Sequence, residues 1–232
     1  MAAAFLNALE PTTATALFAD SVQRTLPRNQ RLFNEGDGSG DAFVIDTGLL
    51  KLFKTTLDGS QALVALRGPG EIVGDLGAMD GQPRLLSAIA AIDTEVTVVP
   101  GDRLVGLIHD RPEFAMAMLS NLTTMIRQSA VHILALASGD ALALVARRLL
   151  QLADDPAYGA VRSERAGTTV IDMPLSQQEV AAWAGVSLRS AATVLKQLRD
   201  DSIVSTSRLQ LVVHDRDELE RRAGPLLAFT SA

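Results

Sequence analysis

The pattern of hydrophobic and polar positions changes twice along this 232-residue chain. Residues 1 to about 26 read as helical, with Pro11 opening the main segment. From Gln30 onward, short apolar runs alternate with glycine turns, a pattern that indicates β-strands. The strand-like runs cover residues 42–45, 49–55, 61–66, 71–73 and 89–99. Because no helical crossover separates these runs, the pattern predicts a sandwich or roll rather than βαβ units.

A long helical period follows, from Arg111-Pro112 to about Ser138. Its apolar seam recurs at alternating steps of three and four, at Leu119, Leu122, Ile126, Ser129, Ile133 and Leu136. Such a seam is typical of a coiled coil, although a helix buried in one core can show it too. Since this helix is long and lies between segments of different class, we expect it to mediate dimerisation. Asp140 then caps a further helix at 141–154, and the polar segment 156–169 reads as a loop or hairpin before 170–173.

The stretch 175–199, LSQQEVAAWAGVSLRSAATVLKQLR, predicts a pair of helices joined by a tight turn. Ser176 and Glu179 form a capping-box pattern, Gly185 ends the first helix, and Ser187 is an N-cap for the second. The positions expected to lock the pair together are Val180, Ala181, Ala184, Val186, Ala191, Val194, Leu195 and Leu198. The outward face of the second helix is polar and basic, which indicates a helix-turn-helix with a recognition helix.

Two short strand-like segments, 203–204 and 209–213, follow this helix and are joined by a polar turn at 205–208. A β-hairpin directly behind a recognition helix is typical of a wing. The alternative, a helix pair inside an ordinary α-rich core, does not account for the hairpin. We therefore predict a winged helix-turn-helix.

Composition narrows the function. The formal net charge of −6 and pI of about 5.1 lower the expected non-specific affinity for nucleic acid, but charges act locally over a Debye length of ~8 Å. Cysteine is absent, which excludes disulfides, thiolate zinc sites and iron–sulfur clusters. No apolar run approaches the ~20 residues of a membrane span, and the N-terminus lacks a basic signal region. We expect a cytoplasmic protein with no metal, no membrane partner and, since no acid–base or nucleophile constellation can be assembled, no enzymatic activity.

A second candidate site lies in 68–90, GPGEIVGDLGAMDGQPRLLSAIA. Its glycines allow close backbone approach, Asp75 supplies a carboxylate, and Arg84 follows nine residues later. A glycine-rich turn beside one arginine suits a phosphate, and a carboxylate suits a sugar hydroxyl. The alternative is that a roll with many turns carries these glycines for steric reasons alone.

The chain resembles the Crp/Fnr family of bacterial transcription regulators from about residue 8 to 223. The resemblance lies in LFNEGD at 32–37, Gly74-Asp75-Leu76-Gly77 with Arg84, DTEVTVVP at 93–100, and the helix-turn-helix. It implies an α+β fold with a cyclic-nucleotide-binding, jelly-roll-like β-roll at 1–110. A long dimerisation helix would follow at 111–138, and a winged helix-turn-helix DNA-binding domain at 139–232.

The resemblance also implies an effector site. Residues matching Gly74, Asp75 and Arg84 contact the nucleotide, its ribose hydroxyl and its cyclic phosphate in cyclic-AMP-binding members. Leu85 stands where a phosphate-binding serine is expected, which removes a hydrogen bond of about 1.5–3 kcal/mol. The implied effector positions are Gly74, Asp75, Leu76, Arg84, Leu85, Ser129 and Ala130. These positions indicate a cyclic-nucleotide-type pocket with degraded cyclic-AMP chemistry. Three outcomes stay open: it binds cyclic AMP or cyclic GMP, it is empty, or it takes another ligand.

Cyclic-AMP-type members read DNA with an arginine, a glutamate and a second arginine, where this chain has Leu188, Arg189 and Thr193. Arg189 suits guanine, and Leu188 or the Thr193 methyl suits thymine methyl groups. Phosphate contacts are expected from Ser187 and Ser190 at the helix N-terminus and from the cations Lys196, Arg199 and Arg208. For the three cations, solvated surface charge is the alternative. The implied DNA-binding positions are Ser176, Gln177, Ser187, Leu188, Arg189, Ser190, Thr193, Lys196 and Arg208.

The function implied is that of a homodimeric, sequence-specific transcriptional regulator of a palindromic operator, with RNA polymerase as a further partner. Effector occupancy near Ser129 would set the helix register and hold the two recognition helices ~34 Å apart. Two alternatives stay open. The pocket is degenerate and the regulator works without an effector, or the winged helix binds a protein partner instead of DNA.

Overall fold

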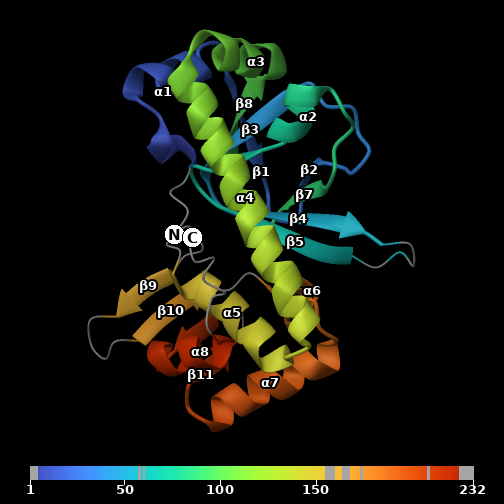
Figure 1. Ribbon diagram of the computed structural model, residues 1–232, viewed down its shortest axis with the longest axis vertical. Helices are drawn as coiled ribbons and strands as arrows, with labels where there is room; N and C mark the ends of the chain where they lie inside the picture. Colours follow the sequence, from blue (N-terminus) through green and yellow to red (C-terminus); the bar gives the residue numbers. More distant parts are fainter. Residues whose placement is uncertain are drawn as a thin grey trace, which may run out of the picture. The chain divides into compact units, whose positions relative to one another are not determined.

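The computed structural model describes residues 5–56, 59, 61–154, 160–163, 168–172, 175–207 and 210–224. The chain divides into two compact units, a first unit of Ala2–Met125 and a second unit of Ile126–Ala232. One helix, α4 (Pro112–Ser138), begins in the first unit and ends in the second, as Figure 1 shows.

The first unit is a β-roll with short helices. Its elements are η1 (Phe5–Ala8), α1 (Pro11–Phe18), β1 (Val22–Leu26), β2 (Arg31–Phe33), β3 (Asp41–Thr47), β4 (Leu50–Thr55), β5 (Gln61–Arg67), β6 (Ile72–Val73), α2 (Asp75–Asp80), β7 (Ser87–Ala90), β8 (Thr94–Pro100), α3 (Gly101–Asp110) and the first turns of α4. The strands form two four-stranded antiparallel sheets, in the orders β1-β8-β3-β6 and β2-β7-β4-β5. The roll predicted from the strand spacing is thus confirmed.

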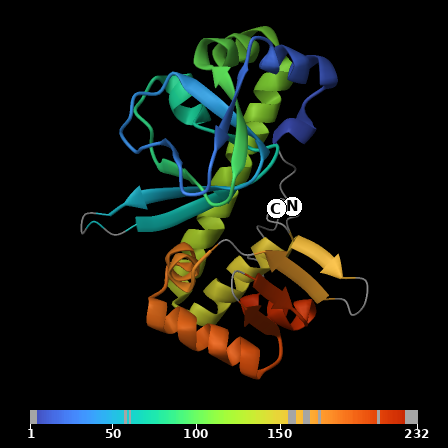
Figure 2. The same ribbon diagram turned by 180° about the vertical axis from the view of Figure 1, so that it is seen from behind.

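Two apolar cores hold this unit together. The first is buried among strands of both sheets and includes Leu26, Phe43, Ile45, Leu52 and Val96. The second joins α1, α3 and the first turns of α4 to strands β3 and β8, with Leu17, Leu104 and Phe114 among its buried members. Figures 1 and 2, which view the unit from opposite sides, show α1 and α3 together at one end of the roll.

Several sequence expectations for this unit are wrong in detail. Residues 22–26 form β1 rather than helix, because Asp20 takes a φ of 54° after the helix ends and turns the chain into a strand that pairs with β8. The run 89–99 is two strands, separated by a turn in which the Thr94 hydroxyl donates to the Ile92 carbonyl. Strand β2 and helices α2 and α3 were not expected. Helix α2 lies between β6 and β7, but these strands belong to different sheets, so it makes no βαβ unit.

The long helix is confirmed as a single element, α4, beginning and ending at the expected residues. Much of its apolar seam faces solvent in the single chain. Ile126 and Ile133 are 67% and 65% exposed, and Leu119 is also exposed. An apolar row of this kind on one helix is a surface that a partner would cover.

The described part of the second unit combines the end of α4, the helices α5 to α8 and a small sheet. Its elements after α4 are α5 (Ala141–Asp154), β9 (Ala160–Ser163), β10 (Thr168–Asp172), α6 (Gln177–Ala184), α7 (Leu188–Asp200), β11 (Val204–Ser207), β12 (Gln210–Val213) and α8 (Arg216–Ala223). The strands form one antiparallel sheet in the order β11-β12-β10-β9. Helix α5 packs against α6, α7 and α8, burying Leu149, Trp183, Leu195 and Leu219. Asp140 caps α5 as predicted, accepting from the backbone N–H groups of Leu142 and Ala143.

The wing contains two antiparallel strands, β11 and β12, as expected, but β11 extends further along the chain than predicted. Ser205, Thr206 and Ser207 were placed in the turn, whereas they extend β11 and pair with Val212, Leu211 and Gln210. Their polar side chains are compatible with a strand because one face of this small sheet is open to water. The preceding segment, predicted as a loop or hairpin, contains the antiparallel strand pair β9 and β10, and Thr168 and Thr169 already belong to β10.

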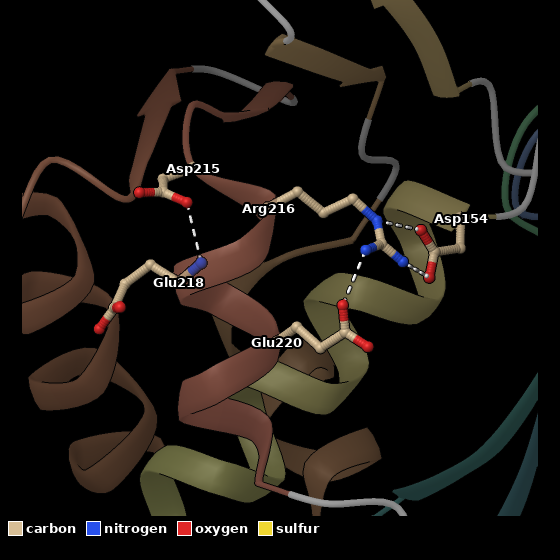
Figure 3. A network of polar contacts seen from close by, with 5 residues as sticks. All are labelled: Asp154, Asp215, Arg216, Glu218 and Glu220. Atoms are coloured by element: carbon tan, nitrogen blue, oxygen red, sulfur yellow. Dashed lines mark hydrogen bonds and ion pairs between the residues drawn. The ribbon is translucent and has the colours of Figure 1, made fainter.

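A network of charged groups ties α8 to the end of α5. Arg216 makes two parallel contacts to Asp154, each of 2.9 Å, and a third of 2.9 Å to Glu220 (Figure 3). The carboxylates raise the pKa of Arg216, chiefly through the hydrogen bond to Asp154. Asp215 caps α8 by accepting from the Glu218 backbone N–H at 2.8 Å. Such bidentate pairing fixes geometry better than a single ion pair does.

We expect Arg216→Ala to lower the free energy of unfolding by about 1 kcal/mol, because it removes a partly buried bidentate pair. The matched control is Arg221→Ala, whose exposed side chain pairs with Glu218 on α8 alone. Urea denaturation followed by circular dichroism compares them. An equal decrease in the free energy of unfolding in both variants would contradict a special role for the Arg216–Asp154 pair.

Candidate effector pocket and nucleic-acid interface

The glycine cassette begins where β6 meets α2. Gly74 has a φ of 75°, the left-handed conformation that favours glycine, and directly precedes the helix. A β-carbon at this position would collide with the guanidinium of Arg84. Gly74 is therefore required both for the backbone turn and for the close approach of an arginine.

Arg84 is buried inside the first unit with only 6% of its surface exposed. It donates to the carbonyl oxygens of Gly74 and Asp41, both at 2.6 Å, so that it joins the cassette to the start of β3. Its guanidinium carbon lies 4.6 Å from the ring centre of Phe33 and 5.5 Å from that of Phe43. Burial lowers the pKa of Arg84, while Asp41, Asp37 and Asp75 oppose that shift.

Asp75 is the second buried charged group of the cassette, 5% exposed. Burial raises the pKa of its carboxyl above the usual range, against smaller opposing effects that include Arg67 and Arg84. Within the described part of the chain, Asp75 Oδ2 and Arg84 Nε are buried atoms without a hydrogen-bond partner. A buried carboxylate oxygen without a donor is destabilising by itself and becomes useful once a ligand hydroxyl donates to it.

The remaining effector positions are more exposed. Leu85 is 60% exposed, and Leu76 also reaches solvent. Ser129 is exposed and Ala130 half-buried on α4, in the second unit. Their contact with an effector stays a prediction.

The helix-turn-helix follows the predicted local design closely. The Ser176 hydroxyl accepts from the Glu179 backbone N–H at 3.2 Å, and Glu179 accepts from the Ser176 backbone N–H at 2.8 Å, completing the capping box. Gly185 takes a φ of 73° and ends α6. Ser187 caps α7 by accepting from the Ser190 backbone N–H at 3.0 Å. Of the eight residues expected to lock the helices together, all are buried except Val186, which is half-buried.

Most of the predicted DNA-contacting residues that the structure describes are exposed to solvent. Gln177 is exposed beside the capping box, and Leu188 is 50% exposed at the start of α7. Arg189, Thr193 and Lys196 are exposed along α7. Their spacing of four and three residues places them on one row of the helix, opposite its buried face.

Several polar groups of this face already have partners. The Thr193 hydroxyl donates to the Arg189 carbonyl at 2.9 Å, and the hydroxyls of Ser187 and Ser190 lie 2.8 Å apart. Lys196 pairs with Asp200 at 3.7 Å. Arg199 is half-buried and donates to Thr206 of the wing at 3.3 Å, so it holds the wing to α7. Arg208, also predicted to contact DNA, lies outside the described residues.

Two contacts that position the helix-turn-helix were not predicted. The guanidinium carbon of Arg148 on α5 lies 4.7 Å from the ring centre of Trp183, and Arg148 Nε donates to the Trp183 carbonyl at 3.0 Å. Leu136, near the end of α4, packs so closely on Gly185 that a β-carbon there would sit 2.5 Å from its Cδ2. No spacing in the sequence links these partners, although a lone tryptophan beside a helix turn could have prompted a search for a cation.

His132 on α4 lies in the same part of the second unit. Burial, followed by Arg148 and Arg147, lowers its pKa to about 4, so its imidazole is neutral at ordinary pH. Among the described residues, no group of three or more His, Asp or Glu side chains is arranged to hold a metal ion. In that same portion, no helix is both long and apolar enough to cross a bilayer.

We expect Asp75→Asn to raise the free energy of unfolding near neutral pH, because it removes a buried carboxyl group whose charged form is disfavoured by burial. The pKa of Asp75 is raised in the folded state, so its stabilising contribution is present at low pH and is lost as pH rises through that pKa. The advantage of the Asn variant should therefore shrink as pH falls. Urea denaturation at neutral and mildly acidic pH tests this, with exposed Asp80→Asn as the control. A destabilised Asp75→Asn variant at neutral pH would contradict it.

Comparison with known proteins places both sites in a family context. Residues 23–111 match the cyclic nucleotide-binding domain, and residues 145–222 match the Crp-like helix-turn-helix domain. The chain is 26% identical over 221 residues to the CRP-like cAMP-activated global transcriptional regulator of Mycobacterium tuberculosis, covering 95% of this chain and 96% of that protein. It is 28% identical over 182 residues to the cyclic AMP receptor protein of Thermus thermophilus, covering 78% of this chain and 79% of that protein.

Among solved structures, FixK2 from Bradyrhizobium japonicum superposes with a TM-score of 0.76 at 20% identity, covering 88% of this chain and 98% of that one. This likeness concerns the fold. The two matched domains stand in the same order as the roll and the helix-turn-helix described above, and relatives of nearly full length carry the names of CRP-like regulators. The chain belongs to the Crp/Fnr family of transcriptional regulators.

Proposed function

We propose that this regulator acts as a homodimer that binds a two-fold symmetric DNA operator through α7 and responds to an effector in the glycine cassette. The observation that carries the proposal is the outer row of α7. A well-capped helix presents an exposed arginine, threonine and lysine, while its opposite face is fully used for packing. This is the arrangement of a helix that enters the major groove.

The dimer part of the proposal rests on α4. The exposed apolar row that includes Leu119, Ile126 and Ile133 needs a cover, and a second copy of the same helix supplies a self-complementary one. Two copies of α7 would then read half-sites about one DNA turn, ~34 Å, apart. The bound dimer would meet RNA polymerase at the promoter and either recruit or exclude it.

A cyclic nucleotide is the effector class that the cassette supports best. In this proposal Asp75 accepts from the ribose hydroxyl through its unpartnered oxygen, and Arg84 turns its guanidinium to the cyclic phosphate. The names of the Mycobacterium tuberculosis and Thermus thermophilus relatives refer to cyclic AMP, which is consistent with this assignment. Leu85 supplies no hydroxyl, so affinity should be lower than in a site with a serine there.

The second candidate is a regulator whose roll is a scaffold, and one observation favours it. Both terminal nitrogens of Arg84 already donate to backbone carbonyls. A phosphate would have to bind the remaining N–H donors of the guanidinium or displace one of these charge-assisted bonds. A protein-interaction role for the winged helix is the third reading. It predicts weak salt dependence of binding to DNA, whereas phosphate contacts release counterions and make binding steeply salt-dependent.

We expect Ile133→Glu to convert the dimer to monomer and to abolish high-affinity binding to a palindromic operator, because it places a charge in the seam. The control is Gln128→Glu, which adds the same charge at an exposed position off the seam. Sedimentation velocity and operator binding would be measured on both. A dimeric Ile133→Glu protein would show that α4 is not the dimer contact.

We expect Leu85→Ser to tighten cyclic AMP binding by about one to two decades, by restoring a hydroxyl to the phosphate. Isothermal titration calorimetry of both proteins with cyclic AMP and cyclic GMP tests this. DNA affinity would be followed in parallel with and without nucleotide. If neither protein shows a heat of binding while DNA binding stays intact, the β-roll is a scaffold and not a site for a cyclic-nucleotide effector.

A further inference from the structure

We infer that α7 reads each half-site through one guanine and one nearby thymine methyl group, with Arg189 on the guanine and the methyl of Thr193 on the thymine. The inference rests on the proposed function, since it names the DNA chemistry that the same surface would recognise. The outer row of α7 consists of Arg189, Thr193 and Lys196. The inference follows from which atoms of these residues are exposed and make no bond within the described part of the chain.

Arg189 is the one base-reading cation in the first turn of α7. It is exposed, and no described residue pairs with its guanidinium. A free guanidinium presents two parallel N–H donors, which match the O6 and N7 acceptors of guanine in the major groove. The position near the helix N-terminus is also where the helix dipole favours approach to a polyanion.

Thr193 follows one turn later on the same row. Its hydroxyl donates to the Arg189 carbonyl at 2.9 Å, so its proton is used within the helix and its methyl group remains for a partner. Four residues of helix advance ~6 Å, which places the methyl within about two base pairs of the guanine. Thymine is the base that carries a methyl group in the major groove.

The neighbouring side chains confine base reading to these two positions. The hydroxyls of Ser187 and Ser190 are paired with each other, and Lys196 faces Asp200. Asp200 offsets the positive charge of Lys196 at the C-terminal end of the row. Leu188 lies about 100° from Arg189 around the helix, on its flank, and is placed beside the groove rather than over the bases.

The test uses the full-length chain and a duplex that it selects from a library randomised over about two DNA turns. Each thymine of the selected half-site is replaced in turn by uracil, which lacks only the methyl group. Gel-shift titration should show one position per half-site at which uracil weakens binding by about fourfold, the value of one buried methyl group. Replacing the guanine by 7-deazaguanine, which lacks N7, should weaken binding of the wild type by about tenfold and leave Arg189→Ala unaffected.

Two variants of Thr193 separate its methyl from its hydroxyl. Thr193→Val keeps a methyl and removes the hydroxyl, so it should bind like the wild type and keep the sensitivity to uracil. Thr193→Ser keeps the hydroxyl and removes the methyl, so it should bind the thymine duplex about fourfold more weakly and lose that sensitivity. Unchanged binding of both variants to non-specific DNA at low salt verifies that the helix-turn-helix is folded.

The outcomes are distinct. If Thr193→Val loses affinity while Thr193→Ser does not, the hydroxyl reads the base and the inference is wrong. Specific binding that is insensitive to every uracil substitution overturns it as well. A library from which no sequence is enriched contradicts the proposed function itself, and the half-site assignment falls with it.

Discussion

Inside the β-roll, the guanidinium of Arg84 joins two backbone segments that are distant in sequence, by donating to the carbonyl oxygens of Gly74 and Asp41. Two features are tied to this interaction. Gly74 must lack a side chain, because a β-carbon there would collide with the guanidinium, and Asp75 at the start of α2 shares the buried interior with a cation. A buried charge of this kind is costly unless hydrogen bonds compensate it, and the two carbonyl oxygens do so in part.

The same interior contains groups that a pure scaffold would not need. Asp75 Oδ2 and Arg84 Nε are buried without a described partner. Burial raises the pKa of Asp75 and lowers the pKa of Arg84, so that it disfavours the charged form of both residues. Perturbed, partly unsatisfied ionisable groups are more typical of binding sites than of cores. The bonds of Arg84 to carbonyl oxygens favour a structural role instead, because they already use two of its five N–H donors. The net preference of the pocket is the balance of these two effects.

The sequence was most informative where local rules act alone. Ser176, Gly185 and Ser187 define the ends of α6 and α7 through capping and a positive φ, and all three act as expected. It was less informative where pairing partners decide the structure. Residues 22–26 became a strand because β8 offers an edge, and Ser205 to Ser207 became a strand because β12 pairs with them. The internal hydrogen bonds of Arg84 and the packing of Arg148 on Trp183 join residues whose separation carries no pattern. Candidate site residues could therefore be named from the sequence, but the hydrogen-bond and packing partners of each side chain within the fold could not.

Trp183 has a consequence for how the molecule can be observed. It is the chain's single tryptophan, it is almost fully buried in α6, and its ring faces the Arg148 guanidinium. The chain's tryptophan emission therefore arises wholly in the second unit, beside the turn that leads into α7. The first unit is silent at that wavelength. Spectroscopy of the unmodified protein can thus follow the helix-turn-helix separately from the β-roll, and circular dichroism supplies the signal of both together.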